Sequence, residues 1–167
     1  MADKEPLRLP GDVLKTMGVL HVNYTNLEYV LSFYLWKLAF KDQHKGQALT
    51  AWMNFERKVD ALRTLLQMGV IDEPHRGKLE GLLKNVDSAR KARNALVHSL
   101  LITDGVRPSG EIKMKAIRIR ASGDGGLKHK KEQVTAGKIR VVAEDLRDCG
   151  HGLTRLATEM FGQAPVA

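Results

Sequence analysis

The chain has 167 residues, a length that suits one domain with a sizeable core. Its single cysteine, Cys149, excludes an intramolecular disulfide and a cysteine-based zinc set, which is the usage expected in a reducing cytosol. No stretch has the apolar length of a signal core or a membrane span, so we expect a soluble, cytoplasmic protein.

The first helix is predicted over residues 13–40, and it carries two apolar faces. The main stripe consists of Val13, Met17, Leu20, Tyr24, Leu27, Leu31, Leu35 and Leu38. The second face, roughly opposite, consists of Val19, Val22, Val30, Phe33 and Trp36. Two such faces leave two alternatives open: the helix is central in a bundle, or its second face is an oligomer interface.

Two further helices are predicted in the first hundred residues. Residues 47–68 repeat the helical period, with Trp52, Met53 and Phe55 expected in the core. The third helix begins near Pro74, because an acidic pair followed by proline is typical of a first helical turn. It continues to about residue 101.

After residue 101 the pattern changes from helix to strand. Residues 103–110 are expected to be a loop, and residues 111–121 a strand with a bulge near Ala116. The turn sequence at 122–126 leads to a partner strand at 127–134, and residues 138–142 are a candidate third strand. The last helix is predicted over 143–161, weakened by Gly150 and Gly152, with a frayed tail at 162–167. The predicted fold is one mainly α domain, a four-helix bundle with a basic β-hairpin inserted at 102–142, between the third and last long helices.

Most of the charge lies in that insertion. Residues 107–140 carry +7 of the net +8. A localised basic patch on a nearly neutral domain is typical of a surface that binds a polyanion, most simply nucleic acid. The alternative is a solvated hairpin kept soluble by its lysines.

Residues 89–101, ARKARNALVHSLL, place polar groups on a surface that otherwise has the pattern of a core. Arg90 and Arg93 fall inside the apolar stripe of the third helix, Asn94 lies at its edge, and His98 lies one turn further along the same edge. A guanidinium that faces a core keeps its charge, so it needs a carboxylate, a phosphate or a protein partner there.

Arg93-Asn94-Ala95-Leu96-Val97-His98 is an R-x4-H pattern with asparagine directly after the arginine. It resembles the signature of the HEPN superfamily (higher eukaryotes and prokaryotes nucleotide-binding domain). Asn26-Leu27-Glu28 on the first helix resembles the N-x-L-E element of many small bacterial members. The resemblance covers residues 12–101 and the last helix, and the basic hairpin resembles an insertion.

The resemblance implies a helical bundle that forms a homodimer with a composite cleft, and in many members a metal-independent endoribonuclease that needs no cofactor. Such enzymes use the RNA's own 2′-hydroxyl and leave a 2′,3′-cyclic phosphate. Members occur in toxin–antitoxin and phage-defence systems, which makes an antitoxin protein a further expected partner beside RNA. No membrane partner is expected.

In that setting each motif residue has an expected role. His98 would be the acid/base group, Arg93 would hold the scissile phosphate, and Asn94 would contact the phosphate or orient His98. Glu28 would pair with Arg93, an assignment that rests on helical geometry. Expected RNA contacts are Arg90, Lys113, Lys115, Arg118, Arg120, Lys128, Lys130 and Lys131. No metal ligands are expected, because His21, His44, His129 and His151 lack metal-like spacing.

Three alternatives remain at this level. Arg93 and Glu28 would form a purely structural ion pair. The bundle would be a non-catalytic module that holds RNA or a partner protein. Lastly, the chain would be a structural adaptor that dimerises through Val22, Val30, Phe33 and Trp36 without RNA affinity.

Overall fold

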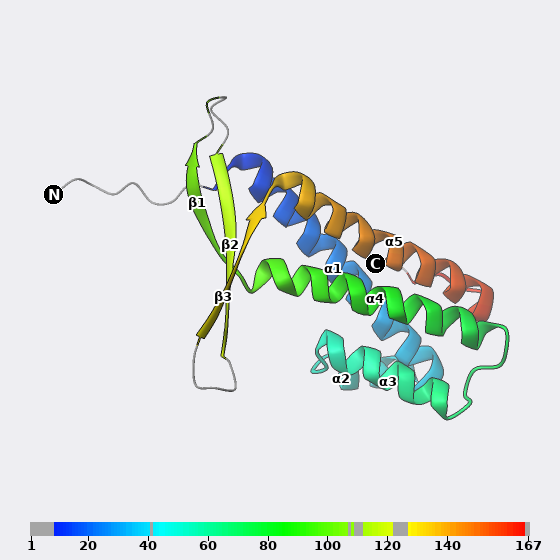
Figure 1. The fold of residues 1–167 in the computed structure, drawn as a ribbon. Coiled ribbons are helices and arrows are strands. Elements are labelled where there is room, and N and C mark those ends of the chain that lie inside the picture. The colour runs from blue at the N-terminus through cyan, green and yellow to red at the C-terminus, as the bar shows by residue number, and fades with distance from the viewer. Residues whose placement is uncertain (1–8, 41, 107, 109–111, 122–126, 166–167) are drawn as a thin grey trace.

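The structure is a computed structural model that describes residues 9–40, 42–106, 108, 112–121 and 127–165, without the side chains of 119–121 and 127–129 (Figure 1). Within these residues the chain is mainly helical and carries a small antiparallel sheet. The elements are α1 (Gly11–Ala39), α2 (Gln43–Thr50), α3 (Phe55–Gln67), α4 (His75–Val97), β1 (Leu100–Val106), β2 (Ile112–Ala121), β3 (Leu127–Val134) and α5 (Ala136–Phe161). None of the described helices is both long and apolar enough to span a membrane.

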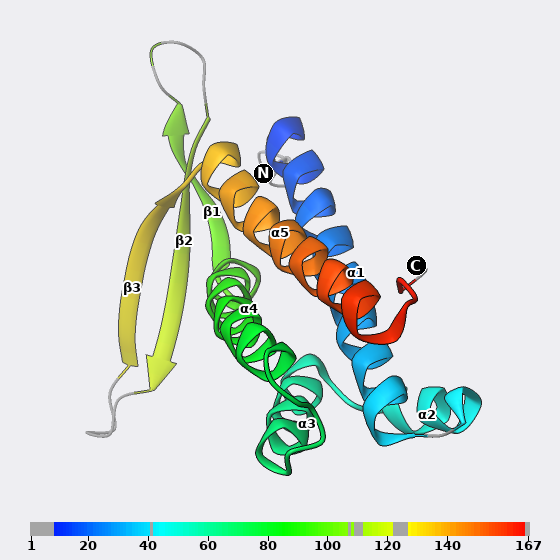
Figure 2. The ribbon, with the colours of Figure 1, turned by 90° about the vertical axis from the view of Figure 1, so that its right-hand side faces the viewer.

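Helix α1 is the centre of the bundle. It packs along α5, which also covers α4, and its C-terminal half contacts α2 and α3 (Figure 2). Residues 30–36 of α1 are buried on every side, which explains the second apolar face at Val30, Phe33 and Trp36. The central position predicted as one alternative is therefore confirmed for this half. Val19 and Val22, nearer the N-terminus, are exposed.

The single helix predicted over residues 47–68 is wrong, because the chain breaks between α2 and α3. Asn54 caps α3, its side chain accepting a hydrogen bond from the Arg57 backbone N–H (2.9 Å). Helix α2 lies against α1, where the Trp36 indole donates to the Thr50 hydroxyl (2.7 Å). A Cβ on Gly46 would lie 2.9 Å from the Trp36 ring, so this close approach requires glycine.

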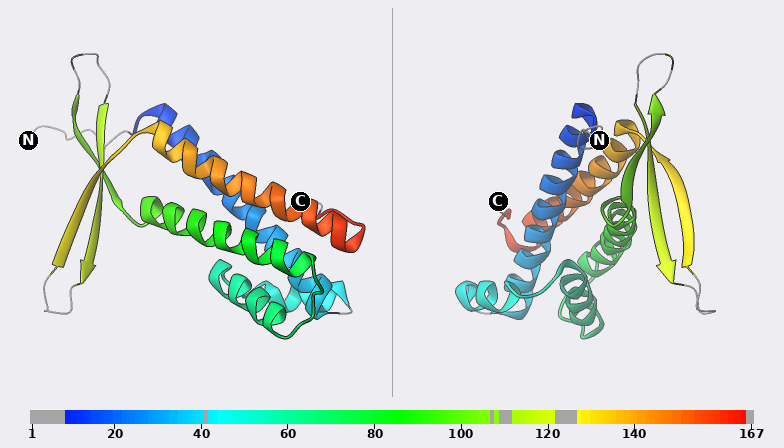
Figure 3. Two further views of the ribbon diagram at one scale, coloured as in Figure 1. Left: turned by 45° about the vertical axis from the view of Figure 1, so that its right-hand side comes forward. Right: turned by 90° about the vertical axis from the view of Figure 1, so that its left-hand side faces the viewer.

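The insertion between α4 and α5 is a three-stranded sheet in the order β1-β2-β3 and not a two-stranded hairpin. The loop predicted at 103–110 is wrong in its first part, because residues 100–106 form β1 and pair with β2. The bulge predicted near Ala116 is also wrong. Met114 and Ala116 are both buried on one face of a regular ladder, and the register shift lies in β1, between Thr103 and Val106. The strands run across the helix axes at one end of the bundle (Figure 3).

Helix α5 begins at Ala136, so the third strand predicted at 138–142 is wrong. Thr135 caps the helix by accepting from the Lys138 N–H (3.2 Å), which starts the helix seven residues before the predicted position 143. Gly152 was expected to weaken this helix. Instead it allows close packing of α5 on α4, because a Cβ there would lie 2.7 Å from a methyl of Leu82.

Trp52 was predicted to be in the core, but its position in the α2–α3 break leaves it 90% exposed. Trp36 is buried and hydrogen-bonded. We expect Trp52→Phe to remove the long-wavelength, acrylamide-quenchable part of the fluorescence and to change the free energy of unfolding by no more than about 0.5 kcal/mol. Trp36→Phe is the matched variant and should remove the blue, poorly quenched part. Fluorescence that stays equally quenchable in Trp52→Phe would contradict this placement.

Candidate functional site

The side chain of Arg93 is held against an aromatic stack that joins three helices. Its guanidinium carbon lies 4.1 Å from the centroid of the Tyr24 ring. Tyr24 in turn stacks on Phe55, with centroids 4.7 Å apart and planes 16° apart. The stack fixes α4 against α1 and the start of α3, and it gives Arg93 one orientation.

Asn94 and His98 follow Arg93 in sequence at the end of α4. The Asn94 side-chain oxygen accepts a hydrogen bond from Nη1 of Arg93 (3.0 Å). His98 is the C-cap residue of α4, and its backbone N–H donates to the carbonyl oxygen of Asn94 (3.1 Å). The two side chains are therefore one turn apart on neighbouring positions of the helix surface. Arg93 and Asn94 are half-buried, whereas His98 is exposed.

Glu28 does not pair with Arg93 among the described residues. Its Oε1 accepts from Nζ of Lys58 on α3 (2.8 Å), and the Lys58 side chain is buried. The predicted pairing is wrong because helical periodicity on α1 and α4 cannot show that α3 brings the Lys58 ammonium to the Glu28 carboxylate. Glu28 still contributes negative charge near the stack, since it acts on Tyr24 together with Arg93.

The environment of Tyr24 is partly shielded from water and carries both signs of charge. Burial raises the pKa of its hydroxyl above the ordinary value, the charge of Arg93 opposes that rise, and Glu28 adds to it. The phenol is therefore neutral at physiological pH. Sequence reasoning placed Tyr24 only in the apolar stripe of the first helix and did not single out Lys58. For Tyr24, the sequence signal was its spacing, because it lies one turn before Glu28 on the first helix.

Arg93 retains unused hydrogen-bonding capacity. Its Nε is buried and has no hydrogen-bond partner among the described residues. A buried guanidinium N–H without a partner is energetically costly, so structures that keep one commonly supply the partner as water or ligand. A water molecule or an anion can supply that partner to Arg93.

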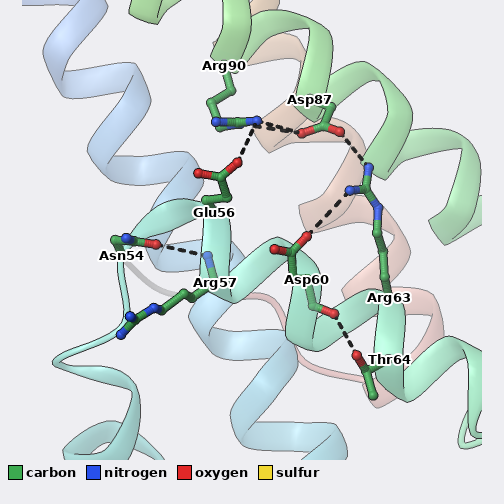
Figure 4. A network of polar contacts seen from close by, with 8 residues as sticks. All are labelled: Asn54, Glu56, Arg57, Asp60, Arg63, Thr64, Asp87 and Arg90. Carbon is green, nitrogen blue, oxygen red and sulfur yellow. Dashed lines mark hydrogen bonds and ion pairs between the residues drawn. The ribbon is translucent and has the colours of Figure 1, made fainter.

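Arg90, expected as an RNA contact, is engaged in a network between α3 and α4 (Figure 4). Its Nη2 lies 3.3 Å from Glu56 and 3.4 Å from Asp87. Asp87 also accepts from Arg63 (2.7 Å), and Arg63 lies 3.7 Å from Asp60. These contacts give Arg90 a structural position between α3 and α4.

The basic residues expected to bind RNA are divided between the two faces of the sheet. Lys113, Lys115 and Lys131 lie on the outer face, where Lys115 pairs with Asp104. Arg118 and Lys130 lie on the inner face, which is turned toward α4 and α5. Arg120 and Lys128 are opposite one another in the backbone register, but their side chains lie outside the described residues. The patch is therefore two surfaces and not one.

Comparison with known proteins adds no relative: no protein-family model, curated protein or solved structure matches the chain. In the described part of the molecule, no three histidine, cysteine, aspartate or glutamate side chains lie close enough together to hold a metal ion.

The α3–α4 network makes stability depend on pH. Burial alone would raise the pKa of Asp87, but the Arg63 hydrogen bond and the charges of Arg63 and Arg90 outweigh it and lower the pKa below 3.8. A carboxyl whose pKa is lower in the folded state stabilises the fold above its unfolded pKa, and this contribution is lost as pH falls through the folded pKa.

We therefore expect Asp87→Asn to lower the free energy of unfolding by about 1–3 kcal/mol at pH 7 and by little at pH 2. Asp60→Asn is the control, because Asp60 contacts the same Arg63 but is 65% exposed, against 20% for Asp87. Its effect should stay within about 1 kcal/mol. Chemical denaturation at both pH values measures these differences, and an Asp87→Asn effect that does not change with pH would contradict the assignment.

Proposed function

We propose that this chain is a HEPN-type, metal-independent endoribonuclease whose site is Arg93, Asn94 and His98. The observation that carries the proposal is the placement of Arg93. Its guanidinium is oriented by Tyr24 and Asn94, it has no carboxylate partner among the described residues, and His98 follows one turn after Asn94 at the end of α4. A structural arginine would be expected to have a carboxylate partner, as Arg90 has.

Arg93 would bind the scissile phosphate. A guanidinium presents several N–H donors in a plane and keeps its charge, which suits the non-bridging oxygens of a phosphate. Because Tyr24 and Asn94 already orient the group, little reorganisation is needed when charge develops on those oxygens in the transition state. Asn94 uses its side-chain oxygen on Arg93, so its amide N–H groups stay available for the phosphate.

His98 would supply proton transfer. One imidazole accepts the proton of the RNA 2′-hydroxyl as the 2′-oxygen attacks the adjacent phosphorus, and the bond from phosphorus to the 5′-oxygen breaks. A second, protonated imidazole gives a proton to the leaving 5′-oxygen, and a 2′,3′-cyclic phosphate remains. A homodimer that brings two copies of His98 into one cleft supplies both groups. The exposure of His98 leaves it accessible to RNA and to a second protomer.

In this proposal the chain would act as a toxin or phage-defence nuclease in the cytoplasm, held in check by an antitoxin protein. The helical bundle and the basic sheet support an RNA substrate, since a cation-rich surface draws a polyanion toward the site.

The second candidate is a non-catalytic RNA-binding module. The observation that favours it is the concentration of cations on both faces of the sheet, away from Arg93. Such a module binds RNA in a salt-dependent manner and leaves it intact.

The proposal predicts that purified protein cleaves single-stranded RNA in excess EDTA and leaves 2′,3′-cyclic phosphate ends. His98→Ala should lower kcat by about 10²–10⁴-fold, the usual contribution of a general acid or base. Gel analysis of a mixed RNA pool, with chemical mapping of the new 3′ ends, measures both. Cleavage by His98→Ala at the wild-type rate would contradict the proposal. If the wild-type protein binds RNA in a salt-sensitive manner and leaves it intact, the second candidate is favoured.

Arg93→Gln should lower kcat by about 10²–10³-fold, because it removes a charged donor aimed at the phosphate. Lys91→Gln is the matched control, since Lys91 is an exposed cation on the same helix, two residues earlier. It should leave kcat nearly unchanged. Equal losses in the two variants would show that only general positive charge matters, in which case Arg93 has no specific role.

A further inference from the structure

A pocket of about 340 Å³ lies where the inner face of the sheet meets the last turns of α4 and the first turns of α5. Figure 2 shows these three elements together at one end of the bundle. The volume falls within the range of small-molecule sites, about 300–1,000 Å³. The pocket is separate from Arg93, which is not among its lining residues.

Small side chains leave the space open. On α4 the lining includes Ala92 and Ala95 beside Leu96 and Ser99, and on β2 it includes Ala116 beside Arg118. Because the three alanines end at Cβ, they leave room between helix and sheet, and Leu96, Val141 and Val142 make this space largely apolar. Such a gap suits a flat, apolar group.

The rim of the pocket carries like charges that face one another. Arg118 on β2 is directly opposite Lys130 on β3, and like charges at directly opposed positions destabilise a sheet. Lys138 at the start of α5 adds a third cation. Among the lining residues, Glu132 is the one carboxylate, 3.9 Å from Lys130 and 3.8 Å from Lys138. A net charge of about +2 remains, which an anion would neutralise.

Arg118 supplies an independent observation. Its Nε is buried and has no hydrogen-bond partner among the described residues, although the residue lines the pocket. A bound anion would give this N–H the partner that the protein does not provide.

We propose that this pocket binds a nucleotide, with the phosphate at Arg118, Lys130 and Lys138 and the base in the alanine-lined gap. Polar acceptors within the wall favour a base over an acyl chain. The Ser99 hydroxyl donates to the Ala95 carbonyl (2.5 Å) and keeps its lone pairs, and Glu132 offers carboxylate oxygens. Exocyclic amino groups donate to such acceptors, so bases that carry one (adenine, cytosine and guanine) are favoured over uracil. The site does not depend on RNA cleavage.

Calorimetric titration of AMP and CMP into the full chain tests the proposal. Saturable binding is expected, weakened about tenfold or more by Arg118→Met, which removes the charge, and by Ala95→Leu, which fills the gap. Lys130→Gln, at a position 73% exposed and therefore safe for folding, should weaken it less. Lys15→Gln, an exposed cation on α1, and Arg93→Gln should leave the affinity unchanged.

An octanucleotide identifies the source of the nucleotide. If the wild-type chain binds the octanucleotide more tightly than AMP, and Arg118→Met lowers that affinity to the AMP level, the site holds a nucleotide within an RNA chain. If the octanucleotide and AMP bind with equal affinity, the site holds a free nucleotide. Absence of saturable binding, no effect of Arg118→Met and Ala95→Leu, or inorganic phosphate binding as tightly as AMP would overturn the proposal. Loss of AMP binding in Arg93→Gln alone would also overturn it, because the nucleotide would then occupy the proposed catalytic site.

Discussion

The contact between Arg93 and Tyr24 links the helices that form the candidate site. It stacks a cation from α4 on a ring from α1, which itself stacks on Phe55 of α3. A cation–π contact of this kind contributes about 0.5–2 kcal/mol, with the larger values at desolvated positions. The ring orients the guanidinium without neutralising it. A carboxylate partner would have cancelled the charge that an anionic substrate needs.

The end of α4 is the place where the helical bundle and the sheet meet, and it offers cations on two sides. One side carries Arg93, and the other borders the pocket with Arg118 and Lys130. Both arginines have a buried Nε without a partner among the described residues. Unpaired donors reduce stability, and a bound anion would supply the partner that each of these groups lacks. Arg63, by contrast, has carboxylate partners in Asp87 and Asp60.

Sequence periodicity predicted α1 and α4 and, apart from the bulge placed near Ala116, β2, and the turn sequence at 122–126 predicted β3. It failed where a local hydrogen bond decides the structure. The Asn54 cap breaks the second predicted helix, and the Thr135 cap starts α5 early. The exposure of Trp52 follows from the first of these breaks. For the candidate site, the half-buried positions of Arg90 and Arg93 followed from the apolar stripe. Their partners did not, because Lys58 and Glu56 come from α3, whose packing no periodicity in the sequence reveals.

The most direct test of the central claim changes the RNA and leaves the protein intact. Once a cleaved bond is mapped, a single 2′-deoxy substitution at the nucleotide 5′ to that bond removes the proposed nucleophile and keeps every phosphate. Cleavage at that bond should disappear, while cleavage at other bonds and overall RNA affinity persist. Cleavage of the deoxy-substituted bond at an undiminished rate would contradict the account, because a water molecule or a protein group would then be the nucleophile.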